Sequence, residues 1–389
     1  MTAPQTPLTA QGHAALEYFA LDPAVAHLNH GSFGAVPLSV LAEQDRWRAR
    51  MEKNATRFFT FELPELLRAE AVQVAARLGG DAEGWAFVEN ATSAANSVLN
   101  SLELAQGDVL VTTSHAYGAV LKAMRRRAGE AGAELRVAPV PAPLESEDQV
   151  AEAVAAALCE RTKLLVVDHV TSPTATVFPV ARLVAEARKA RVPVFIDGAH
   201  VPGMLALDVG ALGADWYTGN AHKWLFAPKG CGLLWTAPVW RERTHPAITS
   251  HGWGAGYIAE FEWIGTRDPS PWLCFGAAGK AHDAFGGPAL MARNIALARE
   301  AGAFLNKRWN AVRAAPDSMQ SAMTTFLLAP HGTHEQALNL RRRFSFEHGI
   351  EVPVSAFADK LWLRISAQIY NEMSDYERLG EALAKLHNQ

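Results

Sequence analysis

The feature that most constrains the fold is an alternation of short apolar runs with longer helical patterns between about residues 85 and 240. Amphipathic stretches such as SAANSVLNSLEL, AVLKAMRRRAGEAG, SEDQVAEAVAAAL and VARLVAEARKA separate several of the apolar runs. This alternation predicts an α/β domain in which helices cover both faces of a mainly parallel, seven-stranded sheet. The seven expected strands are WAFVEN, VLVTTS, ELRVAPV, KLLVVDHV, VPVFIDG, ADWYTGN and CGLLWTA.

The pattern changes after about residue 270. The next stretch predicts helices that a Gly-Gly-Pro sequence interrupts, and MTTFLLAP, IEVPVSAF and KLWLRISAQIY then predict strands. The helices THEQALNLRRRFSFEHG and SDYERLGEALAKL accompany these strands. A chain of 389 residues can form two domains. We expect an N-terminal segment (1–30), a large domain (31–270) and a smaller α+β domain (271–389).

The composition narrows the function classes. The net charge is −4 and the pI about 6.4, and the basic clusters MRRRAGE and LRRRF are short enough to be solvated helix faces. We therefore expect no nucleic-acid partner and no binding to anionic membranes. No apolar run approaches the roughly 18 residues of a membrane span, and the N-terminus lacks the layout of a signal peptide.

The cysteine pattern indicates a reducing compartment. Cys159, Cys231 and Cys274 lie far apart and are odd in number, which disfavours a disulfide framework and a thiolate zinc site. The two histidines of HGTHE are typical of a polar loop, and neither GWGAGY nor GAAGK has the context of a nucleotide-binding loop. We expect a cytoplasmic enzyme without a metal ion.

Asp197 and Lys223 together carry the functional groups that one cofactor requires. Asp197 ends the apolar run VPVFID, and Lys223 follows 26 positions later (223 − 197). Ligands of open α/β sheets bind beyond the carboxyl ends of the strands. Taken alone, an aspartate at the end of a strand is more often a helix cap or turn residue than a cofactor ligand. A single lysine is likewise more often exposed to solvent. Together they supply what pyridoxal phosphate requires, a lysine that holds its aldehyde as an imine and a carboxylate that keeps its ring nitrogen protonated.

The segment VENATSAANSVL supplies a place for the phosphate. An apolar strand ends near Glu89, a small polar turn follows, and we expect a helix to start around Thr92 and Ser93. The N–H groups and hydroxyls of such a turn bind phosphate. The same groups also cap a helix, so the two interpretations are compatible.

These motifs carry a family resemblance. IDGAH and YTGNAHKW, with ENATSAAN upstream and LWLRIS downstream, resemble the class V branch of the pyridoxal-phosphate aminotransferase superfamily. LNHGSFGAVP, HAYGAV, DHVTSPTATVFP and GTRDPSPW further resemble its isopenicillin-N-epimerase-like group, which includes the carbon–sulfur lyases of ergothioneine synthesis. The resemblance covers about residues 25 to 375. It implies pyridoxal-phosphate fold type I, the aspartate aminotransferase-like fold, with the cofactor in the large domain.

The resemblance assigns roles around the pyridine ring. Lys223 would hold the cofactor and then move protons at the substrate α-carbon, while Asp197 would pair with the ring nitrogen. His200 would bond the 3′-oxygen of the ring. Tyr117 would stack on the ring, although a lone tyrosine otherwise suggests core packing.

The resemblance also assigns the phosphate contacts. Thr92 and Ser93 would form the phosphate turn, together with Asn220 and His222 from the segment before the lysine. The family often has serine at the position of Asn220, and a buried structural histidine is the alternative for His222. Thr266 would cross to the phosphate of a neighbouring subunit. The resemblance therefore implies a homodimer with a shared active site.

Arg364 in LWLRIS resembles the arginine that holds the substrate α-carboxylate. A planar guanidinium binds a carboxylate with two parallel hydrogen bonds and so fixes its orientation. Ser172 would make a further polar contact to the cofactor, with Thr171 as the alternative. His30 and Arg267 are expected to line the substrate cavity, without an assigned role.

The motifs leave the reaction open. An amino-acid epimerase or racemase, a carbon–sulfur lyase and a class V transaminase all begin by moving the α-proton, and the resemblance to the epimerase-like group favours the first two. A cysteine desulfurase is disfavoured because IEVPVSAFADKLWLR contains no cysteine. A non-catalytic binding protein of the same fold is the remaining alternative, and the presence of lysine, aspartate and arginine argues against it.

Overall fold

The large sheet confirms the seven predicted strands. The computed structural model describes residues 10–387, and its largest sheet has the order β2-β8-β7-β6-β5-β3-β4. β8 is antiparallel to both of its neighbours and the remaining pairs are parallel. The strands are β2 (Trp85–Val88), β3 (Val109–Thr113), β4 (Glu134–Ala138), β5 (Thr162–Asp168), β6 (Val194–Gly198), β7 (Trp216–Asn220) and β8 (Gly232–Thr236).

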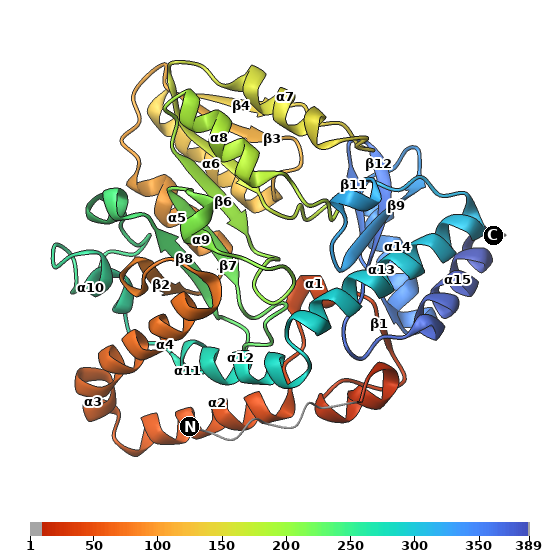
Figure 1. Cartoon of the computed structure of the whole chain (residues 1–389), viewed down its shortest axis with the longest axis horizontal. Coiled ribbons are helices and arrows are strands. Elements are labelled where there is room, and N and C mark those ends of the chain that lie inside the picture. Colours follow the sequence, from red (N-terminus) through yellow and green to blue (C-terminus); the bar gives the residue numbers. More distant parts are fainter. Residues whose placement is uncertain (1–9, 388–389) are drawn as a thin grey trace.

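Both faces of the centre of this sheet are buried, because its middle strands carry apolar residues at successive positions. In β5, Leu165 and Val167 pack into the cluster on one face, while Leu164 and Val166 pack into the cluster on the other. Helices cover both faces (Figure 1). These helices are α5 (Ala91–Ser101), α6 (Gly118–Ala131), α7 (Glu147–Ala157), α8 (Val180–Lys189) and the short α9 (Val209–Leu212).

A further group of helices, which come before and after the sheet segment in the chain, flanks this domain. Within it, α12 contacts α2 and α4, and all three lie along the lower edge of Figure 1. The helices that precede and follow the sheet segment in the chain are α1 (His30–Phe33), α2 (Leu38–Lys53), α3 (Ala55–Arg57), α4 (Leu63–Leu78), α10 (Tyr257–Glu262), α11 (Ser270–Leu273) and α12 (Phe275–Ala284). Short helical turns of other types are η1 (Gly12–Tyr18), η2 (Phe58–Glu62), η3 (Ala82–Gly84), η4 (Pro238–Arg243) and η5 (Asp317–Met319).

The C-terminal unit is built on a second sheet, with the antiparallel order β11-β12-β9. Its elements are α13 (Pro288–Trp309), β9 (Met323–Ala329), α14 (His334–His348), β10 (Ile350–Glu351), β11 (Val354–Phe357), β12 (Lys360–Ser366) and α15 (Met373–His387). The predicted Gly-Gly-Pro interruption separates α12 from α13. Alternation in β12 points Leu363 and Ile365 into the core of this unit, so that Arg364 lies on the opposite face.

The N-terminal strand β1 (Ala26–His27) pairs with β10 in parallel. Ala26 and Leu28 therefore belong to the C-terminal core cluster, whereas Phe275 of α12 belongs to the cluster of the large sheet. The domain boundaries given above stay a prediction. Among the described residues, no helix is both long and apolar enough to span a membrane.

Candidate active site

Asp197 lies at the carboxyl end of β6, beside the ends of β5 and β7. It is 4% exposed, and its Oδ1 accepts a hydrogen bond of 3.0 Å from the Ala199 N–H. Burial raises the pKa of its carboxyl, which Lys223 opposes. The next residue must be small, since a Cβ on Gly198 would lie 2.1 Å from the Tyr217 hydroxyl.

Lys223 lies in the turn after β7, where its backbone N–H donates to the Asn220 carbonyl at 3.1 Å. Its Nζ is 3.4 Å from Nε2 of His200. Burial, and then the charge of Arg364, lowers the pKa of Lys223 to about 8, although Asp197 and Asp168 oppose that shift. About one tenth of the amine is therefore neutral at pH 7, and about half at pH 8. A neutral amine can attack a carbonyl or accept a proton.

The environment of His200 selects its tautomer. Its ring is buried, and the Trp224 indole N–H, which can only donate, lies 3.4 Å from Nδ1. Nδ1 therefore accepts, and in the neutral ring Nε2 carries the proton. Burial and the charge of Lys223 hold the pKa of His200 well below its usual value, which keeps the ring neutral. His200 thus presents an N–H donor beside Lys223.

Arg364 reaches the same cleft from the C-terminal sheet. It is 6% exposed, and one guanidinium nitrogen donates to the Ser172 carbonyl at 2.7 Å. The other nitrogen is 3.3 Å from the Ser32 hydroxyl and 3.4 Å from Oδ1 of Asn29. Burial lowers the pKa of Arg364 to about 10, so the side chain remains a cation at neutral pH.

Sequence reasoning missed Asn29 and Ser32 as neighbours of Arg364. Both lie in LNHGSFGAVP, the motif that also contains His30. Ser32 also donates to Asn29 at 2.5 Å, so the two side chains form one small polar cluster. The motif does show two polar side chains close together in the sequence, which could have indicated a polar site. Their position beside β12, however, follows only from the fold.

The predicted phosphate turn is the start of α5, which begins at Ala91 with Asn90 as its cap. Oδ1 of Asn90 accepts from the Ser93 N–H at 3.0 Å, and Oδ1 of Asn220 accepts from the Ala91 N–H at 2.9 Å. The N–H of Thr92 is in the first turn and has no acceptor within the helix. Asn220 thus orients the turn, and the Thr92 N–H with the two hydroxyls remains for an anion. The helix begins slightly earlier than predicted because Asn90, which the sequence reasoning overlooked, caps it.

His222 lies beside this turn with a fixed ring. Its Nδ1 is 3.1 Å from the Cys231 carbonyl and must donate to it. Burial lowers the pKa of His222 to about 4. A phosphate contact through Nε2 would require a proton there as well, and a bound dianion would favour that protonated form.

The remaining predicted residues lie at different depths. Tyr117 is 45% exposed immediately before α6, so its ring is available to a ligand. Ser172 contributes its backbone carbonyl to Arg364, while the Thr171 hydroxyl pairs with Thr174 at 2.6 Å. Thr266 is exposed and follows Gly265, whose φ is +116°. These positions leave the assigned roles as predictions.

His30 and Arg267 differ in their surroundings. The His30 ring is buried behind Lys223, with Nε2 3.0 Å from the Lys223 carbonyl and Nδ1 2.8 Å from the Tyr370 hydroxyl. The guanidinium of Arg267 forms an ion pair with Glu89 and lies 3.9 Å from the centre of the Trp272 ring. The contacts found for Arg267 thus place it beside the end of β2. A substrate-binding role for either residue stays a prediction.

The side chains of the cleft fit pyridoxal phosphate. Among residues 10–387, no hydrogen bond to Oδ2 of the buried Asp197 is found, and a buried carboxylate without a partner is costly. A protonated ring nitrogen would supply that partner. Lys223, with its lowered pKa, suits the aldehyde, and the start of α5 suits the phosphate.

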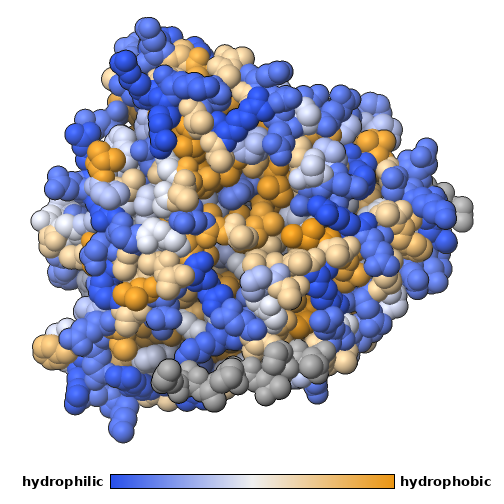
Figure 2. Space-filling model, in the orientation of Figure 1, coloured by the Kyte–Doolittle hydropathy of each residue, from blue (hydrophilic) through white to orange (hydrophobic). Residues whose placement is uncertain are grey.

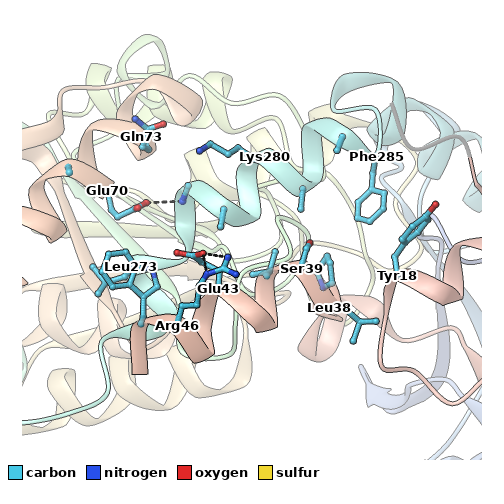
Figure 3. Close-up of a pocket in the computed structure, with 18 of the residues that line it drawn as sticks. Tyr18, Leu38, Ser39, Glu43, Arg46, Glu70, Gln73, Leu273, Lys280 and Phe285 are labelled. Atoms are coloured by element: carbon cyan, nitrogen blue, oxygen red, sulfur yellow. Dashed lines mark hydrogen bonds and ion pairs between the residues drawn. The ribbon is translucent and has the colours of Figure 1, made fainter. Parts of the chain in front are cut away.

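A large groove of the described residues lies elsewhere. It has a volume of about 910 Å³ and lies between α2, α4 and α12, and none of the predicted site residues lines it. Figure 3 shows Glu70 directed at the start of α12, where it accepts from the Gly276 N–H at 2.7 Å, and Glu43 paired with Arg46. Burial raises the pKa of Glu70 to about 7. Size alone therefore does not identify the active site.

Comparisons with known proteins agree with the motifs. The sequence profile of the family described as Aminotransferase class-V matches residues 65–379. The chain is 35% identical to an isopenicillin N epimerase of Amycolatopsis lactamdurans over 96% of this chain and 98% of that one. It is 32% identical to a putative L-cysteine desulfhydrase 2 of Oryza sativa subsp. japonica over 94% of this chain and 85% of that one.

Solved structures share the fold. A complex of the cystine C–S lyase C-DES with its product cysteine persulfide aligns with a TM-score of 0.79 at 20% identity, covering 92% of this chain and 97% of that one. An apo cysteine desulfurase from Thermococcus onnurineus NA1 aligns with a TM-score of 0.81 at 17% identity, covering 98% and 99%. The fold is therefore the predicted fold type I. The chain belongs to the class V aminotransferase family and is a pyridoxal-phosphate-dependent enzyme.

Proposed function

We propose that the enzyme removes the α-proton of an amino-acid substrate and acts as an epimerase or racemase, or as a carbon–sulfur lyase. The observation that carries this proposal is the closeness of Lys223 and Arg364. Asn29 bonds the Arg364 guanidinium, and the adjacent His30 bonds the Lys223 carbonyl. The charge of Arg364 contributes to the lowered pKa of Lys223. One group would move a proton, and the other would hold the carboxylate next to the carbon that loses it. Lys223 follows β7 of the large sheet, whereas Arg364 lies in β12 of the C-terminal sheet. A bound substrate would therefore contact both units of the chain.

Each side chain has a definable part in the reaction. The bound cofactor supplies an electron sink for the charge left at the α-carbon. The Arg364 guanidinium would bind the substrate carboxylate bidentately, because its present acceptors are neutral and would be outcompeted by an anion. Lys223 would accept the α-proton at Nζ, and Asp197 would keep the ring nitrogen protonated. His200 would donate its Nε2–H to the 3′-oxygen.

The relatives support both outcomes of proton removal. Two isopenicillin N epimerases, at 35% and 34% identity, and an L-cysteine desulfhydrase of Arabidopsis thaliana, at 30%, each cover at least 93% of this chain. Epimerisation returns the proton to the opposite face of the α-carbon, and lysis expels a sulfur substituent instead. Class V transamination remains the alternative, and no sulfur nucleophile is present in IEVPVSAFADKLWLR for desulfurase chemistry.

The proposed assembly is a homodimer with shared active sites. Thr266, which by resemblance contacts the phosphate of the partner, is exposed on a loop. Large apolar side chains of the large domain are also exposed, namely Phe61 (70%), Ile248 (54%) and Trp253 (54%). Apolar residues also gather in the middle of the face in Figure 2, where the two sheets approach each other in Figure 1. Equilibrium sedimentation tests the dimer, and a monomer that retains full activity would refute it.

Three measurements on the holoenzyme test which reaction it catalyses. L-amino acids with long or sulfur-containing side chains are incubated in D₂O, and α-deuterium, optical rotation and released sulfide or pyruvate are followed together. An epimerase gives α-deuterium and loss of rotation without sulfide, whereas a lyase gives sulfide and a keto acid. Stoichiometric 2-oxoacid with pyridoxamine phosphate would overturn the proposal in favour of transamination.

A further inference from the structure

Asp168 is a buried acid to which the proposed reaction assigns no task. It is the last residue of β5 and is 4% exposed. It is the register partner of Asp197 on the adjacent parallel strand. Register partners on parallel strands project from the same face, and neighbouring strands are about 4.8 Å apart. Two buried carboxyl groups thus lie side by side at the floor of the cleft.

The surroundings of the pair contain too little positive charge for two carboxylates. Lys223 is the one basic side chain found to favour the ionised form of Asp168, and it also serves Asp197. Backbone N–H groups bond both carboxyls, and no Arg or Lys side chain is found hydrogen-bonded to either among residues 10–387. Two like charges that share one buried site do not both ionise, so one carboxyl retains a proton. Burial and the charge of Asp197 keep the pKa of Asp168 well above its usual value.

A second contact connects Asp168 to α6. The backbone N–H of Tyr117 favours the ionised form of the Asp168 carboxyl by hydrogen bonding, and Tyr117 caps α6. Asp168 therefore lies between Asp197, assigned to the ring nitrogen, and Tyr117, assigned to the ring face.

We infer that Asp168 is a positioning residue that, as a neutral carboxylic acid, donates its proton in a hydrogen bond to Asp197 and accepts one from the backbone of Tyr117. The donated hydrogen bond stabilises the Asp197 carboxylate, which then pairs with the ring nitrogen without a second negative charge beside it. The pair carries one proton and one negative charge in total. The orientation of Tyr117 and the charge of Asp197 are thereby coupled. This inference rests on the proposed roles of Asp197 and Tyr117.

The first test is infrared spectroscopy of the full-length protein at neutral pH, with and without bound pyridoxal phosphate. The carbonyl stretch of a protonated carboxylic acid is expected in both states and is lost in Asp168→Asn. Asp375→Asn is the matched control, because the Asn371 and Glu372 donors already bond that buried carboxyl, and this variant should leave the band in place. The inference is overturned if Asp168→Asn removes no such band. Because the cofactor-free arm needs no catalysis, this result is independent of the proposed function.

The second test compares two variants of Asp168 by the pH titration of the cofactor's visible absorption. Asp168→Asn keeps a neutral donor and an acceptor, so the titration midpoint should stay close to that of the wild type. Asp168→Leu removes both, so we expect the midpoint to shift by about one pH unit and cofactor affinity to fall about tenfold. Equal midpoints and affinities in the two variants would show that Asp168 only fills space. If Asp168→Leu does not fold, the infrared result on Asp168→Asn still decides.

Discussion

The active-site cleft and the groove between α2, α4 and α12 differ in what their walls contain. The groove is large, at about 910 Å³, and within it Arg46 and Glu43 pair with each other near the surface. The cleft instead gathers buried charges from different parts of the chain, including Asp197, Lys223 and Arg364, and their ionisation is strongly shifted. Converging, perturbed groups identify a site better than volume does.

Replacement of Lys223 should lower activity far more than any replacement in the groove, and this is the largest expected difference between the two regions. Lys223→Ala removes the proposed proton acceptor, so we expect kcat to fall at least about a thousandfold, within the usual range for general acid–base residues. Borohydride reduction should also no longer fix the cofactor to the peptide that contains residue 223. Lys280→Ala, in the groove, is the control and should keep both properties. Normal turnover by Lys223→Ala would remove the basis of the assignment.

Replacement of Arg364 by lysine should have the next largest effect. Lysine keeps the charge but loses the bidentate fork, so we expect kcat/KM for an amino acid to fall about a hundredfold. Arg46→Lys is the matched control in the groove and should leave kcat/KM unchanged. If the α-carboxylate is bound elsewhere, both variants will behave alike.

Acidification should destabilise the cleft through His222. Its folded pKa is lowered to about 4, so the unfolded chain binds the proton first as the pH falls below about 6.5. The stabilisation is present above pH 6.5 and is lost between pH 6.5 and 4, by about 2 kcal/mol after allowance for partial exposure. Urea unfolding of the cofactor-free protein at several pH values should show a shallower loss for His222→Asn. An unchanged slope in that variant would contradict the assignment.

The groove should respond in the opposite direction through Glu70. Its folded pKa is raised to about 7, so stability is full below pH 4.5 and falls as the pH rises from 4.5 to 7. Glu70→Gln can still accept from the Gly276 N–H without this penalty. We expect it to be about 1–2 kcal/mol more stable than the wild type at pH 8 and equal to it at pH 4. Unfolding curves at the two pH values measure the difference, and equal stability at pH 8 would show that burial does not destabilise the ionised Glu70 carboxylate.

The large sheet and the cofactor can both be predicted from local sequence patterns. Seven apolar runs became the seven strands because strands buried on both faces need apolar residues at every position. Asp197 and Lys223 were recognisable because the cofactor's chemistry demands those two groups after neighbouring strands. The helix α5 starts at Ala91, one residue before the expected start around Thr92 and Ser93, because Asn90 is its N-cap. Sequence patterns do not fix the end of a helix to a single residue.

Which distant side chains contact one another depends on how the folded chain packs. Arg364 is over 330 positions from Asn29 and Ser32, and its place beside them follows from the packing of β12 against the N-terminal segment. The strand register places Asp168 beside Asp197, and no local pattern in KLLVVDHV reveals this pairing. Local periodicity is encoded residue by residue, whereas ionisation depends on burial and on neighbours that only the folded chain supplies.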